Sequence, residues 1–142
     1  GRSHIVKLAD KVLIDDCYNA NPVSMEAAVD LLLQADGRRV AVMGDMFELG
    51  EQEKEMHARV GKYAVDAGVE CVICAGTLAR CIYEGAVKAA EEKNTGAAGA
   101  VFYFEDRESL LKGIEEILRP GDTVLIKASH GMGFEKIVEQ LS

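Results

Sequence analysis

The sequence lacks the short motifs by which many nucleotide- and metal-dependent proteins hold their ligands. Neither a G-x-x-x-x-G-K-[ST] loop nor a G-x-G-x-x-G loop occurs, so the chain offers no glycine-rich cradle for a triphosphate. H-E-x-x-H, G-x-S-x-G and a second C-x-x-C are also missing, which excludes the familiar helical zinc site, serine nucleophile and four-cysteine zinc site. Function therefore has to be sought in a less familiar arrangement of polar residues.

Positive charge and long apolar runs are also scarce. Sixteen Lys and Arg residues against 24 Asp and Glu residues give a formal net charge of −8, whereas nucleic acids and anionic membranes bind cationic faces. No apolar run approaches the roughly 20 residues of a membrane span, and the N-terminus lacks the charged-then-apolar pattern of a signal peptide. We therefore expect a cytoplasmic protein that binds neither nucleic acid nor membrane.

Cysteine is limited to four residues, of which Cys71 and Cys74 form a C-x-x-C pair. The pair lies in a short apolar segment that reads as a β-strand, and residues three apart on a strand point to opposite faces. The two thiols are therefore expected to pack in the core as small apolar groups, without a disulfide or a metal ion.

Short β-branched runs alternate with amphipathic segments along the 142 residues, a length that suits a single domain over residues 1–142. Strands are expected at residues 5–8, 12–15, 39–43, 71–75, 101–104 and 123–127. Helices are expected at residues 23–34, 51–67, 78–93, 107–118 and 134–141. This order predicts a three-layer, Rossmann-like α/β fold, with a mostly parallel six-stranded sheet, an N-terminal antiparallel hairpin strand and helices on both faces.

Polar side chains follow most of these strands, and ligands of such sheets bind at the carboxyl ends of the strands. The residues concerned are Asp15, Asp16, Tyr18, Asn19, Asn21, Gly44, Asp45, Met46, Glu48, Gly76, Thr77, Glu105, Asp106, Lys127, Ser129, His130 and Gly131. This concentration predicts a binding edge. A nucleotide bound there would be held at its ribose and base, because nothing in these loops forms a phosphate cradle.

Simpler interpretations stay open for several of these residues. The acidic pair Asp15-Asp16 is also typical of a turn or helix cap, and Asn19 and Asn21 before a proline are typical of an Asx turn or a cap. His57 shares an apolar helical stripe, so the pattern favours a buried, hydrogen-bonded histidine over a catalytic one.

Four segments together resemble a known family. They are residues 13–28 (L-I-D-D-C-Y-N-A-N-P-V-S-M-E-A-A), residues 42–50 (V-M-G-D-M-F-E-L-G) followed by H-x-x-V-G at 57–61, residues 127–132 (K-A-S-H-G-M), and the N-terminal Gly1-Arg2. In this order they resemble the C-terminal domain of the Mur ligases, and among these the ligases that add D-alanyl-D-alanine to UDP-N-acetylmuramoyl-tripeptide. Cys17, Ala128 and His130 depart from the commoner family residues Ser, Gly and Arg.

The resemblance implies an ATP-dependent amide ligase of peptidoglycan synthesis, active as a monomer. In that reaction ATP and Mg²⁺, bound mainly by a central domain that is absent here, convert a carboxylate to an acyl phosphate, and the dipeptide amine then attacks it. The C-terminal domain binds D-alanyl-D-alanine and closes on the ribose and base of ATP. The isolated domain is expected to be inactive.

Residue roles follow from the same resemblance. Asp16 is expected to accept hydrogen bonds from the ribose hydroxyls, and Arg2 at the hinge is expected to reach the nucleotide. The nucleotide side is expected to be lined also by Tyr18, Asn19 and Asn21. The dipeptide side is expected to be formed by Lys127, Ser129 and His130, with Lys127 a candidate for stabilising negative charge.

Two other kinds of protein are considered. A phospho-acceptor receiver domain would use an acidic pair, a phosphorylated aspartate, a hydroxyl and a lysine, which Asp15-Asp16, Asp45, Thr77 and Lys127 imitate. The order counts against it, because Asp45 follows the strand directly after the acidic pair, one strand–helix unit too early. A module whose polar edge contacts only another protein is the third possibility.

Overall fold

A computed structural model describes residues 3–93 and 100–142 of the chain. Six strands form one sheet in the order β1-β2-β6-β3-β4-β5, in which β1 is antiparallel to β2 and the other neighbours are parallel. The strands are β1 His4–Lys7, β2 Val12–Asp16, β3 Arg39–Gly44, β4 Cys71–Ala75, β5 Val101–Phe104 and β6 Thr123–Lys127. The helices are α1 Pro22–Leu32, α2 Glu53–Ala67, α3 Ala79–Lys93, α4 Arg107–Ile117 and α5 Glu135–Leu141, with 3₁₀ turns at Gly50–Gln52 and His130–Met132.

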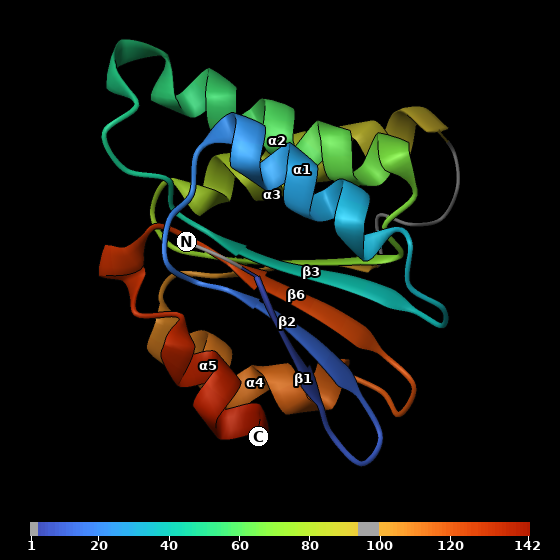
Figure 1. Ribbon diagram of the computed structural model, residues 1–142. Coiled ribbons are helices and arrows are strands. Elements are labelled where there is room, and N and C mark those ends of the chain that lie inside the picture. Colours follow the sequence, from blue (N-terminus) through green and yellow to red (C-terminus); the bar gives the residue numbers. More distant parts are fainter. Residues whose placement is uncertain (1–2, 94–99) are drawn as a thin grey trace.

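The helices cover the sheet as two layers, with α1, α2 and α3 on one face and α4 and α5 on the other (Figure 1). Each layer encloses its own apolar core, because alternate residues of the central strands point to opposite faces. The expected three-layer, Rossmann-like α/β fold with an antiparallel N-terminal strand is therefore confirmed.

Local sequence explains where the helices next to the binding edge begin. Asn21 caps α1: its side chain accepts a hydrogen bond from the Ser24 N–H at 2.8 Å, and the Ser24 hydroxyl accepts one from the Asn21 N–H at 3.0 Å. Pro22 occupies the first helical position, where its missing N–H costs nothing. Asp106 caps α4 through the Ser109 N–H. These caps set the direction in which α1 and α4 leave the edge.

The structure bears out most of the expected elements and adds two. Observed helices and strands differ from the expected ones by up to two residues at their ends, except that α2 is preceded by a separate 3₁₀ turn over residues 50–52. The 3₁₀ turn at residues 130–132 was not expected. Cys71 and Cys74 are free, buried and belong to opposite cores, as predicted. Among the described residues, no helix combines the length and apolarity needed to cross a membrane.

Candidate binding site at the carboxyl end of the sheet

At the carboxyl end of strand β6, neighbouring strands lead to helices on opposite faces of the sheet. Strands β2 and β3 flank β6, and the helices that follow them, α1 and α2, lie on one face of the sheet, whereas α5, which follows β6, lies on the other (Figure 1). Such a reversal opens a crevice between the loops, and in open α/β sheets it is the usual place for a ligand. Lys127, the last residue of β6, therefore lies at the centre of the binding edge.

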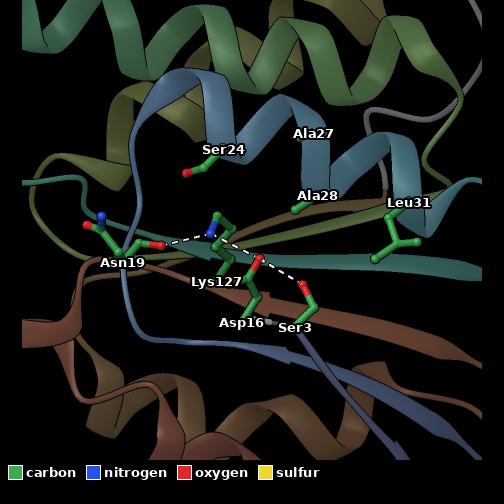
Figure 2. A pocket seen from close by; sticks show the side chains of 8 residues that line it. All are labelled: Ser3, Asp16, Asn19, Ser24, Ala27, Ala28, Leu31 and Lys127. Atoms are coloured by element: carbon green, nitrogen blue, oxygen red, sulfur yellow. Dashed lines mark hydrogen bonds and ion pairs between the residues drawn. The ribbon is translucent and has the colours of Figure 1, made fainter. Parts of the chain in front are cut away.

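Lys127 forms an ion pair with Asp16, the last residue of the neighbouring strand β2. The two residues are partners in the parallel register and point to the α1 face, and the Lys127 Nζ lies 3.0 Å from the Asp16 Oδ2. The same ammonium donates a hydrogen bond to the Asn19 carbonyl oxygen at 2.7 Å (Figure 2). Since the Lys127 side chain is only 3% exposed, its charge is neutralised inside the protein and ties strand β6 to the loop before α1.

The two carboxylate oxygens of Asp16 have different surroundings. Oδ2 accepts from Lys127 and from the Ser3 hydroxyl, which lies 3.2 Å away. Within residues 3–93 and 100–142, no hydrogen bond or ion pair engages Oδ1. With respect to the described residues, Asp16 therefore has one anchored oxygen and one oxygen free to accept further hydrogen bonds.

A hollow of about 370 Å³ lies beside this ion pair, between α1 and the end of β2. Its lining, seen in Figure 2, consists of Ser3, Asp16, Asn19, Ser24, Ala27, Ala28, Leu31 and Lys127. Polar groups gather at the strand end, while Ala27, Ala28 and Leu31 form an apolar wall on the helix. A ligand with hydroxyl groups at one end and a flat or apolar part at the other matches this distribution.

Tyr18 and His130 lie together on the outside of the edge. Tyr18 is 63% exposed, and its ring centroid is 5.5 Å from that of His130 at an angle of 45°. The pair joins the loop after β2 to the 3₁₀ turn after β6, and it offers an aromatic surface on which a planar group can stack.

Asn21 and Ser129 have structural partners of their own. The Asn21 side-chain oxygen caps α1, so the simpler interpretation of this residue is confirmed, and only its amide N–H groups remain for a ligand. Ser129 is 6% exposed, and its hydroxyl accepts a hydrogen bond from the Phe47 N–H at 2.8 Å. Arg2 lies outside the described residues.

A second hollow, of about 400 Å³, lies further along the same edge. It is lined by Asp45, Gly76, Thr77, Glu105, Asp106, Arg107, Glu108, Gly131 and Met132. Arg107 and Glu108 were not predicted, although their position directly after the capping Asp106 at a strand end was a usable signal. The Arg107 guanidinium donates to the Gly133 carbonyl at 3.2 Å and pairs with Glu108 at 2.7 Å, so this cation links α4 to the turn after β6.

Asp45, at the bottom of this second hollow, acts as a buried helix cap. Its Oδ1 accepts the Ala79 N–H at 2.7 Å, at the start of α3. Burial raises the pKa of this carboxyl above its ordinary value, while the backbone N–H groups of residues 77–79 oppose the rise. The carboxylate is thus committed to the helix terminus. In the described part of the chain, no three His, Cys, Asp or Glu side chains are placed to hold a metal ion together.

Comparison with known proteins identifies the family. The family model described as "Mur ligase, glutamate ligase domain" matches residues 1–130, which is most of the chain. The chain belongs to the Mur ligase C-terminal domain family. The resemblance inferred from the four sequence segments is therefore confirmed.

Two relatives of this chain carry the same curated name. The UDP-N-acetylmuramoyl-tripeptide–D-alanyl-D-alanine ligase of Bacillus subtilis is 37% identical over 131 residues, covering 91% of this chain and 27% of the relative. The enzyme of the same name from Escherichia coli is 33% identical over 144 residues, covering 99% of this chain and 29% of the relative. The chain thus spans less than a third of the length of these relatives.

Solved Mur ligase structures share the fold. A crystal structure of MurF from Acinetobacter baumannii superposes with a TM-score of 0.83 at 27% identity, covering 97% of this chain and 29% of the other. MurF from Thermotoga maritima, solved in complex with ADP, superposes with a TM-score of 0.69 at 25% identity, covering 96% of this chain and 29% of the other. The receiver-domain alternative gains no support from these matches, and the buried helix-capping role of Asp45 is unlike that of an accessible phospho-acceptor.

Proposed function

We propose that this chain is the C-terminal domain of an ATP-dependent ligase that adds D-alanyl-D-alanine to UDP-N-acetylmuramoyl-tripeptide in the cytoplasm. The family membership and the shared name of the curated relatives support the reaction. The observation that carries the site is the Asp16–Lys127 pair, which lies where the helices that follow neighbouring strands change faces of the sheet, beside a hollow that suits a nucleoside.

In this proposal the chain holds the ribose and base of ATP. The Oδ1 of Asp16, which no described residue engages, accepts hydrogen bonds from ribose hydroxyls, while Lys127 and Ser3 hold the other oxygen in place. Tyr18, Asn19 and Asn21 line the same side, and Arg2 reaches the nucleotide from the hinge. The phosphates and Mg²⁺ are assigned to the rest of the enzyme, because the chain lacks a phosphate loop and its described residues contain no cluster of metal ligands.

The acceptor dipeptide is proposed to lie at the turn after β6, between the two hollows. Ser129 and His130 belong to this turn, and the second hollow offers the carboxylate of Glu105 to an ammonium group and the guanidinium of Arg107 to a carboxylate. Lys127 reaches this region only by giving up its present partners, so we assign it primarily to holding Asp16 and the Asn19 carbonyl. Closure of this domain over the acyl phosphate would exclude water from the reacting carbonyl.

Nucleotide use by the full-length protein tests this assignment. Asp16→Ala, and the shape-conserving Asp16→Asn, are expected to raise the KM for ATP about 10- to 150-fold, the equivalent of a charge-assisted hydrogen bond worth about 1.5–3 kcal/mol. Asp10→Asn, at an exposed turn distant from the edge, serves as the control and is expected to leave the KM unchanged. Unaltered kinetics in both Asp16 variants would remove the ribose role.

A further inference from the structure

Three hydrogen bonds hold the loop that follows β3 to two other parts of the fold, α2 and the turn after β6. The Met46 N–H donates to the His57 Nε2 of α2 at 2.9 Å, and the Phe47 N–H donates to the Ser129 hydroxyl at 2.8 Å. The Asp45 carbonyl accepts the Ser129 N–H at 2.9 Å. Residues 45–47 therefore connect α2 to the turn after β6, on which the proposed dipeptide site depends.

His57 is buried, with no exposed surface, and its hydrogen bonds determine its chemical form. Its Nδ1 lies 2.6 Å from the Glu53 carbonyl oxygen, which can only accept, so Nδ1 carries the proton. Its Nε2 receives a backbone N–H and must therefore carry a lone pair. The imidazole is thus neutral, and it is the group that satisfies the Met46 N–H.

The loop in turn braces the turn after β6 from one side. The Phe47 ring lies against Gly131, where a Cβ added to the glycine would be 3.2 Å from a ring carbon. On the other side, His130 is held against Tyr18. Ser129 thus has its hydroxyl and its N–H committed to the loop that His57 anchors.

We infer that His57 is a positioning residue: its neutral imidazole fixes residues 45–47, and through them it fixes Ser129 and His130 for the acceptor substrate. That His57 fixes residues 45–47 follows from their hydrogen bonds. That this also positions Ser129 and His130 for the substrate rests on the proposed function, because it takes the turn after β6 as part of the dipeptide site. His57 lies in α2, behind the loop, and touches no substrate itself.

Two substitutions at position 57 separate this role from simple core packing. His57→Gln places a side-chain oxygen close to the position of Nε2 and keeps an acceptor for the Met46 N–H. His57→Asn is too short to reach it. Val60→Ala, on the same buried face of α2, is the matched control, since it removes packing and leaves the Met46 hydrogen bond intact.

Hydrogen exchange and steady-state kinetics of the full-length protein form the test. In His57→Asn, the amides of residues 45–47 are expected to exchange about tenfold faster or more, with β4 unchanged, and His57→Gln is expected to restore slow exchange. The same His57→Asn variant is expected to raise the KM for D-alanyl-D-alanine about tenfold, with the KM for ATP unchanged.

Three results would overturn the inference: exchange at residues 45–47 that is unaffected by His57→Asn, exchange that rises equally in β4, or the same local pattern in Val60→Ala. If His57→Asn fails to fold, rapid exchange of the Met46 amide in the wild-type protein would overturn it instead. A further outcome is fast exchange at residues 45–47 in His57→Asn and slow exchange in His57→Gln, with no change in the KM for D-alanyl-D-alanine. It supports the anchoring by His57 and counts against the proposed dipeptide site.

Discussion

Replacing Lys127 by methionine removes an ammonium group while keeping an unbranched side chain of similar length. Two interactions are lost: the 3.0 Å contact with the Asp16 carboxylate and the 2.7 Å hydrogen bond to the Asn19 carbonyl. Among the residues that the structure describes, the Ser3 hydroxyl is then the one remaining partner of the anchored Asp16 oxygen. The variant therefore measures how much the free energy of unfolding falls when the Asp16 carboxylate lacks its counter-charge.

The magnitude follows from the burial of the two partners. Breaking a fully buried pair by removing one partner costs about 3–5 kcal/mol. Here the Lys127 side chain is 3% exposed but the Asp16 side chain is 13% exposed and faces a hollow of about 370 Å³, so water can partly replace the lost contact. We expect a loss of about 2–3 kcal/mol in the free energy of unfolding.

Urea unfolding followed by circular dichroism provides the assay. With a slope of about 2 kcal/mol per M, the midpoint of the Lys127→Met variant is expected to fall by roughly 1–1.5 M. A cycle with Asp16→Asn is expected to show a coupling of about 1–2 kcal/mol between the two positions. Lys62→Met, which removes an exposed pair with Asp66, should leave the midpoint close to that of the wild type. A wild-type midpoint for Lys127→Met, or additive effects in the cycle, would show that the Asp16–Lys127 pair does not stabilise the fold.

Three further predictions concern stability and reactivity. Gly61→Ala would place a Cβ into the Ile82 carbonyl oxygen, where α2 meets α3, and should cost about 2 kcal/mol or more, or roughly 8 °C in Tm measured by calorimetry; an unchanged Tm would contradict the close helix contact. Burial acts to raise the pKa of Glu70, but the side chain and N–H of Arg39 outweigh it and lower this pKa below its ordinary 4.5. Stability contributed by Glu70 is therefore present above about pH 4.5 and is lost as the pH falls through its lowered pKa, so Glu70→Gln should show a smaller acid-induced decrease in the free energy of unfolding. Burial raises the pKa of the Cys74 thiol, so alkylation near pH 8 should label it in urea and not in the native protein.

Much of the fold could be predicted from local sequence signals. The β-branched runs that became β3, β4 and β6 are short and continuous, as in strands buried on both faces. Asn21-Pro22 and Asp106 marked the first turns of α1 and α4, because capping chemistry acts over three or four residues. These features depend on neighbours in the chain and can be recognised without the tertiary structure.

The arrangement of the site could be predicted only in part. The sequence placed Asp16 and Lys127 at the ends of two strands, but their ion pair depends on β2 and β6 being adjacent, which only the strand order settles. The same holds for the contact between Tyr18 and His130. Ser129 stays a predicted ligand contact, and the sequence gives no sign that its hydroxyl also accepts a backbone N–H from the loop after a different strand. Such long-range polar contacts leave no periodic pattern in the sequence.

We propose that this chain serves a ligase that joins D-alanyl-D-alanine to UDP-N-acetylmuramoyl-tripeptide. The most direct test of this proposal is phosphate release by the full-length protein, supplied with ATP, Mg²⁺ and both substrates, and repeated with each substrate omitted in turn. We expect sustained release of one phosphate per amide bond formed, which requires D-alanyl-D-alanine and falls strongly in Asp16→Asn at limiting ATP. Phosphate release that does not depend on D-alanyl-D-alanine, or that proceeds unchanged in Asp16→Asn, would contradict the proposal.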